Sequence, residues 1–248
     1  MKVGKNKLAK FAEMAGFKNV IQVSFDNIRL NGHAFKGNWN TQFFRKDQPI
    51  ILELGCGKGE YTTSLAEKNP GNHYIGIDIK GARMFTGAKY ALLNGLENVG
   101  FVRTHIEHLK SFFAPEEISE IWLTFPDPQM KRGHKRLTST LFLKMYSEFL
   151  QPGGLVHLKT DSGFMYSYTK AVAKLNKLDI VTDWEDVYAR DDRPEILNVR
   201  TFYEKQWLDR GISTKYLVFR LQSGIDWKEP DEEFEKDPYR SFGRSARQ

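Results

Sequence analysis

The sequence predicts an α/β fold with a mostly parallel, seven-stranded sheet, helices on both faces and an antiparallel strand at one edge. Short apolar runs alternate with segments of helical length and period between residues 49 and 175. Helical crossovers between short apolar strands are typical of a parallel sheet that is covered on both faces. Near the end of the chain, two longer apolar runs are joined by an excursion, which favours an antiparallel pair that closes one edge.

The predicted elements follow from the period of the apolar residues and from the Gly, Pro and Asn residues that separate them. The predicted strands are Pro49–Leu54, His73–Ile79, Val99–Thr104, Glu120–Phe125, Leu155–Thr160, Ile180–Tyr188 and Lys215–Leu221. The predicted helices are Glu60–Lys68, Ala82–Asn94, Glu107–Phe113, Thr138–Leu150 and Gly163–Leu175.

One domain accounts for the length of 248 residues. We expect residues 1–45 to form an N-terminal extension of irregular structure and residues 46–225 to form the α/β domain. Residues 226–248 contain a Lys-Glu-Pro-Asp-Glu-Glu stretch and are predicted to be a solvated tail.

Composition narrows the class of protein. The net charge of +6 favours a polyanionic partner, although it also suits an ordinary soluble protein. A single cysteine excludes an internal disulfide, and the six histidines show no ligand spacing, so we expect no metal. No apolar run approaches the roughly 18 residues that span a bilayer, and the N-terminus lacks the apolar core of a secretion signal. The sequence therefore predicts a cytoplasmic protein without a membrane partner.

The first chemical motif, Glu53-Leu-Gly-Cys-Gly-Lys-Gly59, follows the first predicted strand. Glycines at 55, 57 and 59 allow a sharp turn and close approach of a ligand at the carboxyl end of the strand, where open α/β sheets bind ligands. A dinucleotide fingerprint requires a sixth-position glycine, where this chain has Glu60, and the loop lacks the Gly-Lys-Ser/Thr of a phosphate loop. The motif therefore favours a nucleoside with a cationic amino-acid tail.

Asp78, at the end of the second predicted strand, extends this interpretation. A carboxylate at that place can accept hydrogen bonds from both hydroxyls of a ribose. Glycine-rich turns between a strand and a helix are common without any ligand, but acids at both strand ends favour a cofactor site.

The second motif, Thr124-Phe-Pro-Asp-Pro-Gln-Met-Lys-Arg-Gly-His-Lys-Arg136, joins a strand end to a cationic segment. Pro126 and Pro128 restrict the backbone on both sides of Asp127, so its carboxylate leaves the strand in a restricted direction. The alternative is a rigid loop followed by a solvated run of charge. Lys131, Arg132, Lys135 and Arg136 are the expected contacts to RNA phosphates.

Together these motifs resemble the class I, Rossmann-like S-adenosyl-methionine-dependent methyltransferases, whose first motif reads E-x-G-x-G-x-G. The second motif is similar to the F-P-D-P-W-x-K-x-R-H-x-K-R signature of the bacterial tRNA (guanine-N7)-methyltransferases. Leu158-Lys-Thr-Asp161 and Thr201-Phe-Tyr-Glu204 match two further family motifs. The resemblance implies S-adenosyl-methionine as cofactor and a guanosine in the variable loop of tRNA as substrate.

The resemblance also implies roles for single residues. Guanine N7 carries an in-plane lone pair and no proton, so positioning of the reactants supplies most of the rate acceleration. The catalytic Asp127 then holds the purine and offsets the positive charge that develops on it. Asp127 is also expected at the cofactor, with Glu53, Gly55, Gly57, Gly59, Asp78 and Thr104. The implied substrate contacts are Lys131, Asp161, Thr201 and Glu204. From the residues alone, Asp161 also suits a helix cap, and Thr201 with Glu204 suits a capping box.

The chain departs from the family pattern at three places. Gln129-Met130 replaces the usual Trp-Pro, Gly133 separates Arg132 from His134, and Thr104 stands where an acid or amide is common. Two other functions remain open from the sequence: a methyltransferase of the same fold for a small molecule or protein, and a non-catalytic RNA-binding subunit. The sequence leaves open whether the protein is a monomer or a homodimer.

Overall fold

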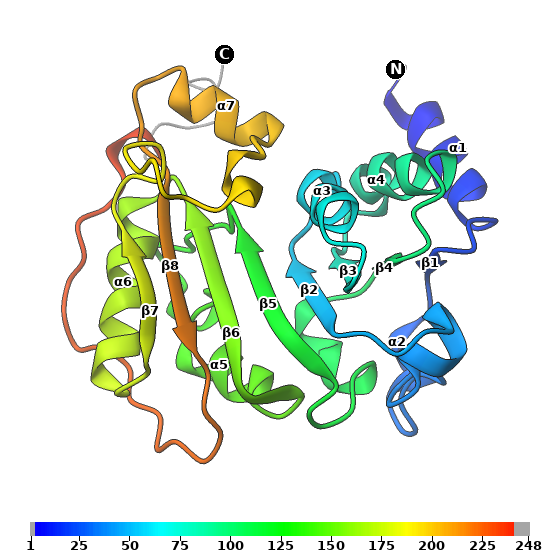
Figure 1. Ribbon diagram of the computed structural model, residues 1–248, viewed down its shortest axis with the longest axis horizontal. Helices are drawn as coiled ribbons and strands as arrows, with labels where there is room; N and C mark the ends of the chain where they lie inside the picture. Colours follow the sequence, from blue (N-terminus) through cyan, green and yellow to red (C-terminus); the bar gives the residue numbers. More distant parts are fainter. Residues whose placement is uncertain (1–2, 241–248) are drawn as a thin grey trace.

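The structure is a computed structural model and describes residues 3–240. Its centre is an eight-stranded sheet in the order β1-β4-β3-β2-β5-β6-β8-β7 (Figure 1). The strands β1 to β6 pair in parallel, and β8 runs antiparallel between β6 and β7, which confirms the predicted sheet type. The strands are β1 (Val20–Ile21), β2 (Ile50–Leu54), β3 (His73–Ile77), β4 (Val99–Val102), β5 (Ile118–Thr124), β6 (Leu150–Thr160), β7 (Ile180–Trp184) and β8 (Lys215–Arg220).

The helices of the described residues lie around this sheet. They are α1 (Val3–Met14), α2 (Phe25–Ile28), α3 (Glu60–Lys68), α4 (Gly81–Leu93), α5 (Thr140–Tyr146), α6 (Gly163–Leu175) and α7 (Phe202–Leu208). Shorter helical turns are η1 (Trp39–Phe44), η2 (Ile106–Ser111), η3 (Gly133–Lys135), η4 (Glu195–Asn198) and η5 (Pro238–Arg240).

Alternate residues of β2 enter two different cores, because side chains of a strand point to opposite faces. Leu52 and Leu54 belong to a core that also holds residues of α5, α6 and the N-terminal segment. Ile51 belongs to a second core with residues of α3 and α4 and with residues of the segment 187–199. Helices therefore cover both faces, as predicted.

The parallel strands place their carboxyl ends at one edge of the sheet. The glycine-rich loop follows β2, Asp78 follows β3, and the Asp127 loop follows β5 at this edge. Helix α7 lies beyond the carboxyl ends of β5 and β6 (Figure 1). This arrangement brings together residues that are more than a hundred positions apart in the sequence.

The N-terminal segment is more ordered than the sequence predicted. Residues 3–45 contain α1, α2 and η1, and β1 pairs with β4 as an eighth strand where seven were expected. Trp39 is fully buried, and its indole nitrogen donates a hydrogen bond to the carbonyl of Phe112 at 2.9 Å. Tertiary packing, which leaves no strong local pattern, organises this segment.

Several predicted boundaries also differ from the structure. The predicted helix Glu107–Phe113 is the 3₁₀ turn η2, and α5 ends at Tyr146 because Leu150 pairs with Ile118 of β5 and starts β6 early. Strand β7 ends at Trp184. The backbone N–H of Tyr188 donates to the side chain of Asp186 in a local turn that competes with strand pairing.

The C-terminal segment was predicted to be solvated from residue 226 onward. Residues 226–240 instead return to the molecule, and Asp237 is 4% exposed. The remaining part of the predicted tail, residues 241–248, lies outside the described residues. Among the described residues, no helix is both long and apolar enough to cross a membrane.

Candidate active site

A cleft of about 400 Å³ opens at the carboxyl edge of the sheet. Residues from both sequence motifs line it, together with residues of α7. The lining residues from the predicted set are Glu53, Gly55, Gly57, Asp78, Asp127, Asp161 and Thr201. The fold therefore brings residues from several distant parts of the sequence, half of those that the sequence singled out, to one cleft.

The glycines of the first motif share a left-handed backbone conformation but differ in their surroundings. Gly55, Gly57 and Gly59 have φ values of 79°, 57° and 72°, in the left-handed region that disfavours other residues. A Cβ at Gly55 would meet no atom within 4 Å, so this backbone is open to a ligand. A Cβ at Gly59 would lie 2.7 Å from the ring of Phe101, so Gly59 serves the packing of α3 on the sheet.

Asp78 is held in place by the backbone around it. One carboxylate oxygen accepts the backbone N–H of Gly57 at 2.9 Å, and the other accepts that of Lys80 at 2.7 Å. The carboxylate therefore ties the end of β3 to the glycine-rich loop and borders the cleft. A carboxylate oxygen accepts more than one hydrogen bond, so Asp78 retains the capacity to bind hydroxyl groups.

Glu53 lies beneath the glycine-rich loop and is 3% exposed. Its carboxylate accepts from the backbone N–H of Thr62 at 2.8 Å and from the hydroxyls of Thr62 and Thr124. Burial raises the pKa of Glu53 to about 7, against the opposing effect of these hydrogen bonds. A buried acid of this kind favours a cationic ligand, because a nearby positive charge stabilises its ionised form.

A smaller pocket of about 190 Å³ adjoins the cleft and shares Gly55, Asp78 and Leu137 with it. Thr104, predicted at the cofactor, lines this pocket and is 7% exposed. The apolar residues around it are Ile79, Ile106, Leu137 and Phe142. The pocket therefore combines apolar walls with a hydroxyl group, as a site for an aromatic heterocycle requires.

The Asp127 loop is strained and internally bonded. Phe125 and Gln129 have φ values of 51° and 47°, which are uncommon for residues other than glycine. The carboxylate of Asp127 accepts the backbone N–H of Gln129 at 3.0 Å, so the chain bends around this side chain. Backbone strain of this kind clusters at functional sites, where the surrounding structure maintains it.

Of the four cations after Asp127, Lys135 and Arg136 have partners within the protein. Lys131 and Arg132 are exposed. Lys135 is ion-paired with Glu107 at 2.9 Å. Arg136 packs its guanidinium against the rings of Phe164 and Tyr168, at 4.8 and 4.4 Å from their centroids.

This placement gives Arg136 a packing role that the sequence did not indicate. Its guanidinium also donates to the carbonyl of Met130 at 3.3 Å and so braces the loop. Lys131 and Arg132 retain the exposure that an RNA contact needs.

Asp161 and Thr201 reach the cleft from two further elements. Asp161 directly follows β6 and is 1% exposed. The N-cap of α6 is the next residue, Ser162, whose hydroxyl accepts from the N–H of Met165. The alternative role of Asp161 as a helix cap is therefore wrong. Thr201 caps α7, since its hydroxyl accepts from the N–H of Glu204 at 3.2 Å.

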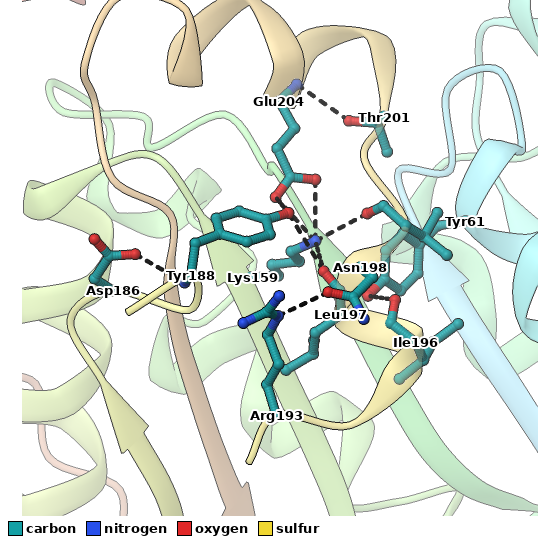
Figure 2. A network of polar contacts seen from close by, with 11 residues as sticks. Tyr61, Lys159, Asp186, Tyr188, Arg193, Ile196, Leu197, Asn198, Thr201 and Glu204 are labelled. Atoms are coloured by element: carbon teal, nitrogen blue, oxygen red, sulfur yellow. Dashed lines mark hydrogen bonds and ion pairs between the residues drawn. The ribbon is translucent and has the colours of Figure 1, made fainter. Parts of the chain in front are cut away.

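Glu204 does not line the cleft. Its carboxylate is fully buried and forms an ion pair with the buried ammonium group of Lys159 at 2.9 Å (Figure 2). It also accepts from the hydroxyl of Tyr188 at 2.7 Å. Glu204, predicted as a substrate contact, therefore belongs to a buried charge pair that joins α7 to β6.

Lys159 is the centre of this network and was not assigned a role from the sequence. Besides Glu204, its ammonium group donates to the carbonyls of Leu197 and Val199, both at 3.0 Å (Figure 2). Burial lowers the pKa of Lys159, and the ion pair with Glu204 opposes this effect. The pair therefore joins β6 to the segment that leads into α7.

Sequence reasoning missed several residues of the cleft, above all one face of α7. Tyr203, Gln206 and Trp207 of α7 line the cleft at the spacing of a single helical face, and Arg210 lines it from the turn that follows the helix. That spacing was a usable signal. Three further cations line the cleft: Lys58 from the glycine-rich motif, where it was given no role, and Lys80 and Arg83, which belong to neither motif.

The charges that line the cleft differ in burial. Glu53 and Asp161 are buried, whereas Lys80, Arg83 and Arg210 are exposed at its surface, as is the carboxylate of Asp127. An acidic interior suits a cationic ligand or N–H donors, and exposed cations suit phosphates.

Solved structures with a similar fold are methyltransferases. The 16S rRNA methyltransferase KamB aligns with a TM-score of 0.57 at 15% identity, over 77% of this chain and 95% of that one. An antibiotic-related methyltransferase aligns with a TM-score of 0.54 at 17% identity, over 82% and 96%. A family model described as a putative methyltransferase matches residues 47–217. Fold and site thus define a Rossmann-like methyltransferase of class I.

Curated relatives narrow the class. The tRNA (guanine-N(7)-)-methyltransferase of Bacteroides thetaiotaomicron is 51% identical over 99% of this chain and 97% of its own length. The protein of the same name from Porphyromonas gingivalis is 50% identical over 94% and 98%, and that of Levilactobacillus brevis is 33% identical over 75% and 86%. The chain belongs to the tRNA (guanine-N(7)-)-methyltransferase family, which confirms the resemblance.

Proposed function

We propose that this protein transfers a methyl group from S-adenosyl-methionine to N7 of a guanosine in the variable loop of tRNA. The observation that carries the proposal is that the proline-flanked Asp127 faces the same cleft as the glycine-rich loop and Asp78. Curated relatives at about half identity bear the corresponding name.

The residues of the cleft fit the cofactor. Gly55 leaves open space where any other residue would place a side chain, so a ligand can approach the backbone closely. Asp78 suits the ribose hydroxyls, the pocket beside Thr104 suits the adenine, and the buried Glu53 suits the cationic amino-acid end. When bound, the cofactor supplies an activated methyl group on a sulfonium.

Asp127 is the proposed catalytic residue. Guanine N7 needs no deprotonation, so the protein contributes by holding the base in line and by stabilising charge. The Asp127 carboxylate accepts hydrogen bonds from the Watson–Crick edge of guanine and offsets the positive charge that develops on the purine. Asp161 and Thr201, which line the same cleft, are further proposed contacts to the substrate.

Binding of tRNA is proposed to involve Lys131 and Arg132 beside the cleft, which are exposed. Each phosphate contact that is lost reduces the slope of log affinity against log salt by a little under about one unit. Lys135 can reach RNA only by leaving its partner Glu107.

The function is tested by incubating the protein with labelled S-adenosyl-methionine and tRNA. The expected product is 7-methylguanosine at one variable-loop position, mapped by mass spectrometry, and a tRNA lacking that guanosine should remain unmodified. Methylation of another position, or of small molecules only, would overturn the proposal.

Asp127→Asn should lower kcat with tRNA by about a hundredfold or more, since a charge facing the purine is lost. The affinity for S-adenosyl-methionine, measured by calorimetry, should change little.

Lys131→Ala should instead raise KM for tRNA and flatten the salt dependence of tRNA affinity. A matched control is Asp231→Asn, an exposed aspartate outside the cleft, which should leave both constants unchanged.

A further inference from the structure

The C-terminal strap, residues 226–240, runs along α6 from its end to its beginning. At the end of α6, Asn176 exchanges two hydrogen bonds of 2.8 Å with the backbone of Lys228. Farther along, the ring of Phe234 packs edge-on against Phe164 in the first turn of α6, at 6.1 Å between centroids. The strap is therefore tied to α6 at both of its ends.

At the beginning of α6 the strap supplies a buried carboxylate. Asp237 accepts a hydrogen bond from the backbone N–H of Phe164 at 3.1 Å and another from the hydroxyl of Ser162. A carboxylate here is favourable, because the first N–H groups of a helix lack partners within the helix. These contacts hold the turn between β6 and α6 from outside the domain core.

The next residues bring the strap to the cleft. The hydroxyl of Tyr239 donates to the carboxylate of Asp161 at 2.9 Å, and the ring of Tyr239 lies 5.0 Å from that of Trp207 in α7. Asp161 and Trp207 both line the cleft. One side chain of the strap thus contacts two elements of the site that are not adjacent in the sequence.

We infer that Tyr239 is a positioning residue for methyl transfer, acting through Asp161. The phenol holds one carboxylate oxygen and thereby sets the direction of a buried acid toward the cleft, while its ring supports α7. This inference rests on the proposed function, in which Asp161 contacts the guanosine. Asp161 lines the main cleft and not the pocket beside Thr104. Since Asp161 is a proposed contact to the guanosine, Tyr239 is expected to govern the use of tRNA and not the binding of the cofactor.

The test removes only the hydroxyl. Tyr239→Phe keeps the ring against Trp207, and loss of a hydrogen bond to a charged group should lower kcat/KM for tRNA by about tenfold. The affinity for S-adenosyl-methionine should stay at the wild-type value. The control is Tyr90→Phe, which removes an exposed tyrosine–carboxylate bond of 2.6 Å to Glu67 outside the cleft and should leave the kinetics unchanged.

A double-mutant cycle separates positioning from a general structural effect. In the Asp161→Asn background, Tyr239→Phe should cause little additional loss, because both changes interrupt the same path. Full additivity, or wild-type kcat/KM in Tyr239→Phe, would overturn the inference while leaving the proposed function intact. If the wild-type chain forms no 7-methylguanosine in tRNA, the proposed function fails and the inference fails with it.

Discussion

The charge of Glu53 depends on the fold, because its carboxyl group is buried. Its pKa is raised from 4.5 to about 7 by burial. A carboxyl whose pKa is higher in the folded protein contributes stability that is fully present below pH 4.5 and is lost as the pH rises through about 7. For a shift of this size, the linked free energy of unfolding is on the order of 3 kcal/mol.

We therefore expect the melting temperature of the ligand-free protein to fall between about pH 4.5 and 7, and to fall less in Glu53→Gln. Binding of a cation favours the ionised carboxylate, so affinity for S-adenosyl-methionine should rise with pH, by at most about tenfold per unit below pH 7. Scanning calorimetry and titration calorimetry measure the two effects. Glu97→Gln, at an exposed acid outside the cleft, should retain both pH dependences, and a flat wild-type profile would contradict the assignment.

Helix α7 lines the cleft, and its stability depends on residues that are distant in the sequence. It has only seven residues, and helices this short are not stable alone. Its anchors are the Thr201 cap and the buried pair of Glu204 with Lys159. The helix is thus fixed by a charge pair, which leaves its other face free to line the cleft.

Glu204→Gln should destabilise the protein by about 3–5 kcal/mol, because it leaves the ammonium group of Lys159 buried without its counter-charge. The double variant Lys159→Met/Glu204→Leu should cost less than the single change, since no charge then remains in the core. Urea unfolding measures both. Lys89→Met breaks an ion pair with Glu13 whose partners are 44% and 46% exposed, and it should cost less than about 1 kcal/mol. Equal costs for the buried and the exposed pair would disprove the anchoring role.

At the scale of the whole molecule, the N-terminal segment is joined to the main core. Trp39 is fully buried and stacks near Phe113, in the core that also holds β2. Strand β1 extends the sheet beside β4. Residues 1–45 were predicted to be an extension. Through these contacts, residues 3–45 stabilise the α/β domain.

Trp39→Ala should therefore lower the free energy of unfolding by about 3–5 kcal/mol, as expected for a large ring removed from a packed interior. The urea midpoint is the measurement. Leu30→Ala, at a side chain of the same segment that is 84% exposed, should change it by less than about 0.5 kcal/mol. A small effect of Trp39→Ala would show that the segment folds independently of the core.

The sequence by itself determined the sheet type, the glycine-rich loop and the Asp127 motif. These depend on local rules: the period of apolar residues sets the element, glycine permits positive φ, and proline restricts it. Parallel strands then bring Glu53, Asp78 and Asp127 to one edge without further information.

Only the tertiary structure decided the pairing of Lys159 with Glu204, the packing of Arg136 on two rings, and the contact of Tyr239 with Asp161. These partners lie from 28 to 78 positions apart, with the nearest pair being Arg136 and Phe164. A local sequence pattern does not predict such contacts. They form only when elements that are distant in the sequence pack together, and each buried charged or polar group then requires a partner.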